Sequence, residues 1–254
     1  MVLPVQNPES PYVTLKIDQG EGFSFAIDKV DEFQSDIKLM SVWAEDATAQ
    51  MKQRIDKKLL AFLADLGDAG VTVSGNPLTN TTGLLINGAT TAFGSTVALG
   101  TGAAATKSVD TGDEIIDKIL LYGQYLDENN APDEGRFVVM PAWAMQLLKG
   151  TNSKLSQVYW TGDSKSPMRN GQVGSIDRFT LYSSNNLAAA SEGGGSTSVI
   201  FGQKAALTFA TQITENRIID NPFSFGKMMQ GLQVYGLQII KPQFLGLDYI
   251  RKGA

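Results

Sequence analysis

The N-terminal part of the chain alternates apolar and polar residues over positions 12–28. Alternation with a period of two is typical of a β-strand that has one apolar face. We therefore predict a β-hairpin over these positions, with its turn at residues 19–22. An isolated two-stranded hairpin is marginally stable in water, so its apolar face must lie against this chain or against another one. We predict that the apolar residues of this face contact another subunit; they are Val13, Leu15, Ile17, Phe23, Phe25 and Ile27.

A long apolar stripe follows at residues 36–66. Apolar residues recur there at spacings of three and four, and the segment contains neither glycine nor proline. This period predicts one amphipathic α-helix that stops at Gly67. At 1.5 Å per residue it would be about 45 Å long, longer than a compact domain of ~100 residues is wide, so we expect a spine along the molecule. Half of a helical bundle is the alternative, but the chain supplies only one comparable helical segment.

The middle of the chain carries local start and stop signals. Residues 71–109 are rich in Thr, Gly, Ala and Asn and predict loops with short strands. Thr111 and Glu114 have the spacing of a capping box, which predicts a helix from there to about Asn129. A buried strand is predicted at residues 136–140, followed by a helix that Pro141 opens.

The last third of the chain reads mostly as β-structure. A strand is predicted at residues 176–182 and a small-residue loop at 188–198. Further strands are predicted at residues 199–201, 206–209, 217–219, 232–240 and 244–250. The alternation within 232–240 changes phase at Gly236, which predicts a β-bulge there. Helices and strands occur without regular alternation, so the fold class is α+β.

The amino-acid composition excludes most of the common kinds of catalytic site. The 254 residues include no cysteine and no histidine. This excludes disulfides, thiolate nucleophiles, imidazole bases and the zinc sites that these residues build. No phosphate-binding motif occurs. We assign no catalytic, cofactor-binding or metal-ligating residue and expect no cofactor, although a hydrolase that uses two carboxylates needs no histidine and stays open.

The charge balance and hydropathy limit the partners. Lys and Arg total 21 against 26 Asp and Glu, a net charge of −5, which disfavours tight non-specific binding to DNA or anionic lipid. No apolar run approaches the ~20 residues that cross a bilayer, and the N-terminus does not resemble a signal peptide. We therefore expect no membrane partner.

Two groups of charged residues have simple interpretations. The acidic residues Asp127, Glu128, Asp133 and Glu134 lack the spacing of a calcium loop and predict a solvated helix end. Lys118 falls on the polar side of its predicted helix and is expected to be exposed.

The aromatic residues divide into two classes. Some fall on predicted apolar faces, where we expect core packing; Trp43 and Phe209 are examples. The others lie in polar segments, where aromatics often anchor protein interfaces. These interface candidates are Tyr159, Trp160, Phe223 and Phe225.

Four runs in the second half of the chain resemble tailed-bacteriophage major capsid proteins. In this sequence they read NNAPDEGRFVVMP (129–141), NGQVGSIDRFTLYSSNNL (170–187), AALTFATQ (205–212) and GLQVYGLQIIKP (231–242). They follow in the family's order over most of residues 110–250. One departure is Asp177-Arg178, where the family commonly has a residue followed by glycine.

The resemblance implies the Hong Kong 97-like fold. The peripheral domain, with the spine helix and long strands, would comprise residues 30–70 and 205–243. The axial domain would comprise 71–204 and 244–254. Residues 1–29 would form part of the extended loop; family members usually have several tens of residues before this strand, so the range is expected to hold only part of that loop.

The resemblance also implies a function. The chain would be a major capsid protein, not an enzyme, that self-assembles into hexamers and pentamers of an icosahedral head shell. That shell would enclose double-stranded DNA without specific binding, in a virion assembled in the host bacterial cytoplasm. Portal, scaffolding or decoration proteins would be further partners. The alternatives are a cellular nanocompartment (encapsulin-like) shell protein and the carboxylate-dependent hydrolase.

Overall fold

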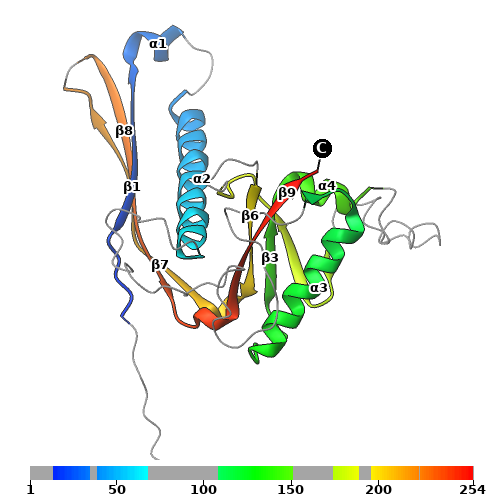
Figure 1. Cartoon of the computed structure of the whole chain (residues 1–254). Coiled ribbons are helices and arrows are strands. Elements are labelled where there is room, and N and C mark those ends of the chain that lie inside the picture. Colours follow the sequence, from blue (N-terminus) through cyan, green and yellow to red (C-terminus); the bar gives the residue numbers. More distant parts are fainter. Residues whose placement is uncertain are drawn as a thin grey trace, which may run out of the picture.

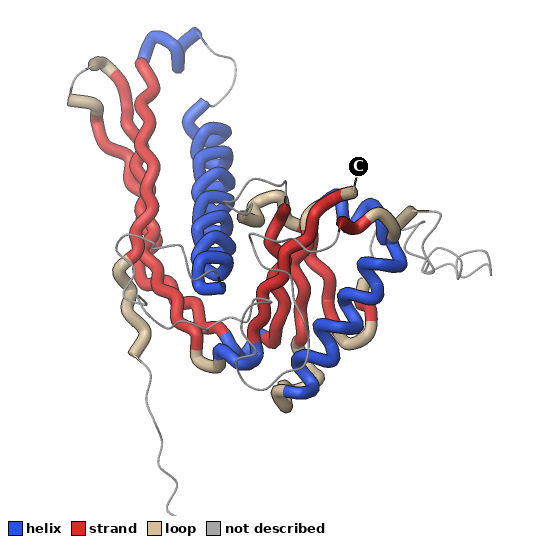
Figure 2. The backbone as a smooth tube through the Cα atoms, in the orientation of Figure 1, coloured by secondary structure: helices blue, strands red, loops and turns tan. Residues whose placement is uncertain are grey.

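The computed structural model describes residues 14–34, 39–67, 108–150, 174–188, 196–222 and 224–253. They form two β-sheets joined by one long helix (Figures 1 and 2). The helices are α1 (Lys29–Gln34), α2 (Leu39–Gly67), α3 (Gly112–Glu128) and α4 (Ala142–Leu148). The strands are β1 (Gln19–Asp28), β2 (Ser108–Val109), β3 (Arg136–Met140), β4 (Ser175–Ile176), β5 (Phe179–Ser183), β6 (Ser196–Gln203), β7 (Leu207–Asp220), β8 (Gly226–Ile239) and β9 (Leu245–Lys252). The predicted α+β class is confirmed.

The first sheet is a long, narrow arm. Its three strands lie in the order β1-β8-β7 and all pair antiparallel. Strands β7 and β8 are 14 residues each. The arm reaches past the N-terminal end of α2 and carries α1 at its far end (Figure 1). We call this sheet the arm.

The predicted hairpin over 12–28 is wrong. Residues 14–18 have no regular secondary structure, and β1 runs straight through the predicted turn at 19–22. Its partner is β8, with Gln19 opposite Tyr235 and Asp28 opposite Gly226. The alternation correctly predicted a strand with one apolar face, but it carries no information on a partner so distant in the sequence.

The predicted bulge at Gly236 lies on the partner strand. The register shift occurs between Thr211 and Ile213 of β7, opposite Tyr235 and Val234. Gly236 has a different role, because a Cβ atom there would collide with the backbone carbonyl of Lys16. A close backbone approach of this kind selects glycine.

The second sheet forms the main body, with strands in the order β2-β9-β6-β3-β5-β4. Strand β3 has the predicted bounds. Helix α3 packs against this sheet by placing Tyr122 and Tyr125 around Phe201 of β6, with ring centroids 4.2 and 5.6 Å away. Aromatic contacts of this geometry contribute beyond their buried area.

Two predictions in this sheet need correction. The strand predicted at 176–182 is a tight hairpin of β4 and β5, in which Ile176 pairs with Phe179. Asp177 has φ 52°, and aspartate tolerates this left-handed region better than most residues. The loop predicted at 188–198 ends sooner, because β6 begins at the buried Ser196. Of the loop region predicted at 71–109, only 108–109 is described.

Helix α2 connects the two sheets. It is 29 residues long, about 44 Å, and matches the predicted spine at 36–66. Met51 and Ile55 in its middle pack with Tyr235 of the arm. Leu60 and Leu63 near its C-terminal end belong to the core of the six-stranded sheet. One amphipathic helix therefore fixes the arm to the body.

The capping box at the start of α3 is confirmed. The Thr111 hydroxyl accepts a hydrogen bond from the Glu114 amide, and the Glu114 carboxylate accepts one from the Thr111 amide.

We expect Thr111→Ala to lower the free energy of unfolding of the unassembled subunit by about 1 kcal/mol, because an amide of the first turn loses its acceptor. Urea unfolding followed by circular dichroism measures this. Thr111→Ser, which keeps the hydroxyl, should stay near wild type; an equal loss in both variants would contradict the role of the cap.

Candidate assembly surfaces

The predicted contact residues of β1 lie partly against their own chain. Phe25 meets Trp43 of α2 edge to face, with 5.9 Å between ring centroids, and Phe23 packs against the cluster of α2 and β8. Ile27 is buried, whereas Leu15 and Ile17 are half-buried. The inner face of β1 therefore has a role inside the subunit. Val13, Tyr159, Trp160 and Phe223 lie outside the described residues.

The far end of the arm is the most exposed apolar surface among the described residues. Phe225, in the turn between β7 and β8, is 90% exposed, and Phe33 of α1 is 83% exposed. Val30 is also exposed. Exposed apolar side chains gathered at one place are typical of interaction sites. Phe33 was missed from the sequence, although it meets the same criterion, an aromatic residue in a polar segment.

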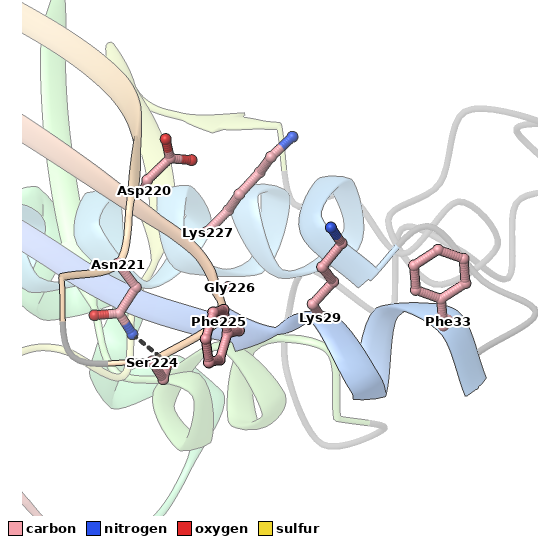
Figure 3. Close-up of a pocket in the computed structure, with 8 residues that line it drawn as sticks. All are labelled: Lys29, Phe33, Asp220, Asn221, Ser224, Phe225, Gly226 and Lys227. Atoms are coloured by element: carbon pink, nitrogen blue, oxygen red, sulfur yellow. Dashed lines mark hydrogen bonds between the residues drawn. The ribbon is translucent and has the colours of Figure 1, made fainter.

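A hollow of about 650 Å³ lies between α1 and the turn that joins β7 to β8 (Figure 3). The backbone amide of Lys29 donates to the carbonyl of Phe225 over 2.8 Å, which joins α1 to the turn. Within the turn, the Asn221 side-chain amide donates to the Ser224 hydroxyl over 2.8 Å. We call the turn between β7 and β8, together with α1, the arm tip.

An ion pair fastens the arm to the spine helix. Lys58 of α2 pairs with Glu21 of β1, whose side chain is nearly buried. The hydrogen bond to Glu21 raises the pKa of Lys58. The pair lies beside Tyr235, whose pKa is raised by burial. These contacts hold the arm at a fixed position on α2.

A buried carboxylate joins α3 to the body sheet. Asp248 of β9 is fully buried, and one of its oxygens accepts hydrogen bonds from Lys118 Nζ and from the Tyr122 hydroxyl, both over 2.6 Å. Burial, and then the charge of Asp248, raise the pKa of Tyr122 well above its ordinary value. Lys118 was expected to be exposed, and instead it is half-buried and ion-paired.

A second charged network lies at the C-terminal end of α3. Arg178 of the β4–β5 turn binds Asp127 and Asp133, each over 2.6 Å. Arg136 of β3 binds the same two carboxylates, over 2.7 and 3.0 Å. Burial raises the pKa of Asp127, but the hydrogen bonds from Arg178 and Arg136 outweigh it and lower the pKa below its ordinary value. The predicted solvated helix end is thus an ion-pair network, and Arg178 is the residue that departs from the family's glycine.

These charged groups stabilise the subunit. Asp127, Asp133 and Asp248 all have cationic partners, so the network supplies structural ion pairs. Within the described part of the chain there is no group of three or more acidic residues arranged to hold a metal ion. No described helix is long and apolar enough to cross a membrane.

The sequence pattern that defines a family of phage capsid proteins matches residues 12–234. The chain belongs to this family. It is similar to a structure from Mycobacterium phage Che8, with 22% identity and a TM-score of 0.69 over 93% of this chain and 72% of that one. It is also similar to the capsid of cyanophage P-SCSP1u, with 16% identity and a TM-score of 0.63 over 99% of this chain and 81% of that one. No curated protein matches the chain.

The chain is also similar in structure to the protein of a virus-like particle. A virus-like particle from Pyrococcus furiosus matches with 9% identity and a TM-score of 0.54, over 91% of this chain and 75% of that one. At such identities the similarity shows a shared fold. Family and fold together confirm the Hong Kong 97-like architecture. This capsid protein is a structural component of the phage head shell in the virion, where it acts by self-association, and it is not an enzyme.

Proposed function

We propose that this capsid protein assembles into hexamers and pentamers that close an icosahedral shell around double-stranded DNA. The observation that carries the proposal is the arm: it projects beyond α2 and exposes two aromatic side chains at its end. A lone subunit gains nothing from these exposed rings, whereas a shell covers them. Contacts of modest size suit assembly, because defects are corrected only where association is reversible.

The two sheets support a division into the proposed capsid domains. Residues 30–70 and 205–243, the proposed peripheral domain, contain α2, β7 and β8. Residues 71–204 and 244–254, the proposed axial domain, contain all strands of the six-stranded sheet. Residues 1–29 would supply part of the extended loop, and β1 within them pairs with the arm.

Charge and family support the further partners. A net charge of −5 suits a wall that encloses DNA without binding it tightly. Portal, scaffolding or decoration proteins would complete a head that assembles in the host bacterial cytoplasm.

Electron microscopy of purified particles tests the proposal. We expect closed shells with five-fold and six-fold capsomers. In particles from the native source, DNA and a portal vertex support a phage head. Encapsulated enzymes without a portal or genome would instead indicate a nanocompartment, and a protein that stays monomeric at all concentrations would contradict the proposal.

The predicted contacts of β1 allow a direct test of assembly. We expect Ile17→Ala with Phe25→Ala to leave a soluble, folded subunit that gives few shells, because the part of each half-buried side chain that the single subunit leaves exposed would meet a neighbour. Sedimentation measures the fraction in shells, and circular dichroism checks the fold. Ser24→Ala, on the opposite face of the same strand, is the matched control. Normal shells from the double variant would refute this role of β1.

A further inference from the structure

We propose that the subunit consists of two units of different stability: the arm opens together with the N-terminal half of α2 while the body stays folded. The boundary lies inside the helix, between Ile55 and Leu60. Proteins open locally in cooperative units, and units with few buried apolar contacts open first. The arm is therefore the part of the subunit whose stability assembly can raise most, a consequence that rests on the proposed shell.

The apolar cluster that joins the arm to α2 is small. Among the described residues its buried members are Met51, Ile55 and Tyr235, and the half-buried Phe23 packs beside them. The core of the body draws buried side chains from α2, α3, α4, β3, β6 and β9. Burial of apolar surface is the main favourable contribution to folding, so the arm is held in place by much less of it than the body is.

The N-terminal half of α2 is more exposed than its C-terminal end. Val42 and Trp43 are 51% and 47% exposed, whereas Leu63 is 2% exposed. Ile218 and Leu232 of the arm strands are exposed as well. Among the described strands, β1 and β7 each pair with β8 alone, so the arm has two open edges. Sparse apolar packing and accessible backbone hydrogen bonds are typical of segments that open at low free energy.

The root of the arm belongs to the body. Ile239 at the end of β8 and Ala206 just before β7 lie in the core of the body, and the Ile240 amide donates to the Ala206 carbonyl over 2.8 Å. The register shift between Thr211 and Ile213 then interrupts the ladder of β7 and β8. A bulge disrupts the ladder locally, so the two sides of it are less tightly coupled. The second boundary, in the arm sheet, is therefore this bulge.

Hydrogen exchange of the full-length unassembled subunit, followed by mass spectrometry of overlapping peptides, tests the inference. We expect amides of β1 and of β8 as far as Val234 to exchange ~100-fold or more faster than those of α3, β6 and β9. Within α2, amides up to Ile55 should exchange with the arm, and amides from Leu60 onward should exchange with the body. Equal protection of the arm and the body would overturn the inference.

Two matched variants identify the units independently of the absolute rates. Ile55→Val removes one methyl group from the arm cluster, and Ile119→Val removes one from the core of the body, where Ile119 is fully buried. Each should speed exchange ~2- to 10-fold, the effect of deleting one buried methyl group, in its own unit only. Circular dichroism checks that both variants stay folded. If either variant speeds exchange equally in both units, the subunit opens as one unit and the inference is wrong.

Exchange in assembled shells tests the link to assembly. A partner that binds only the closed arm stabilises it by mass action, so we expect the arm amides to exchange ~10-fold or more slower in shells, with a smaller change in the body. Shells whose arms exchange as in the unassembled subunit would overturn this link and leave the proposed function intact. Failure of the wild type to form any shell would overturn the proposed function instead, whereas the exchange of the unassembled subunit would still decide whether it has two units.

Discussion

Replacing Arg136 by methionine is expected to lower the free energy of unfolding of the subunit by about 3 kcal/mol. Arg136 is almost fully buried, and its guanidinium donates to the backbone carbonyls of Ala131 and Pro132 over 2.7 and 3.0 Å. It also pairs with Asp127 and Asp133. Methionine fills similar space but donates nothing, so two carbonyls in the segment that follows α3 lose the guanidinium as a donor.

The size of this effect follows from the surroundings of Arg136. Removing one partner of a buried ion pair costs ~3–5 kcal/mol when the other partner stays buried. Asp127 and Asp133 are exposed enough to be solvated, and they keep Arg178. The Arg136 Nη1 atom makes no hydrogen bond to the described residues. The loss therefore lies near the lower end of the range.

Arg178→Met is the matched control for this experiment. It removes contacts to the same two carboxylates, but Arg178 is about one-third exposed, so solvent screening should limit its effect to ~1 kcal/mol. Urea unfolding of the unassembled subunits measures both variants. Equal losses would contradict the view that burial of Arg136 sets its contribution.

The same network gives the pH dependence a defined sign. The pKa of Asp127 is lowered in the folded subunit. A carboxyl of this kind adds stability above its unfolded pKa of ~4, and the gain is lost as the pH falls through the lowered folded pKa. The difference between wild type and Arg178→Met should therefore shrink in acid. A difference that grows below pH ~4 would show that the aspartates do not carry the interaction.

Elements with local signals could be predicted from the sequence. The capping box of Thr111 and Glu114 places the start of α3, and the apolar run of 136–140 gives β3 its bounds, because both signals lie within a few residues. The spine helix has a period that persists over many turns, so its existence was also readable. Local chemistry and the observed element agree in each of these cases.

Features that depend on distant segments could not be predicted. Lys118 occupies a polar helical position, and only the fold brings Asp248 of β9 to within 2.6 Å of it. Arg136 and Arg178 converge on the same aspartates because β3 and β5 are neighbours in the sheet. The partner of β1 lies near the other end of the chain. Pairing of this kind is set by the tertiary fold, which local periodicity does not report.

Two residues that we predicted to lie in the core are partly exposed, which agrees with the proposed assembly. Trp43 and Phe209 fall on apolar faces and were expected in the core, but they are 47% and 43% exposed in the single chain. Trp43 of α2 touches Phe25 of the arm, and Phe209, itself in β7 of the arm, lies against Tyr235 of β8. The apolar pattern predicts that both side chains are buried, but the single subunit buries each of them only in part. Contact with other copies would cover the part that stays exposed.

Replacing Lys118 by methionine is expected to lower the free energy of unfolding by about 3 kcal/mol. Asp248 is fully buried, and Lys118 supplies its positive partner at 2.6 Å. Without the lysine, the carboxylate keeps the Tyr122 hydroxyl and its own strand's Tyr249 amide, which donates over 2.9 Å, but it loses the ammonium group that lies 2.6 Å away. A buried charge without its counter-ion is among the most destabilising defects a core can carry.

A combined variant distinguishes the lost ion pair from lost packing. Lys118→Met, Asp248→Leu and Tyr122→Phe together remove the carboxylate and both side-chain donors while keeping similar volume. Replacing a whole buried polar group by well-packed apolar residues is often neutral, so the triple variant should recover to within ~1 kcal/mol of wild type, measured by urea unfolding. If the losses simply add, the three residues contribute independently, and the buried ion pair does not explain the effect of Lys118→Met. If the triple variant recovers, the stability lost in Lys118→Met comes from the buried charge of Asp248 that has lost its lysine. The three residues then act as one unit that fixes α3 on the body sheet.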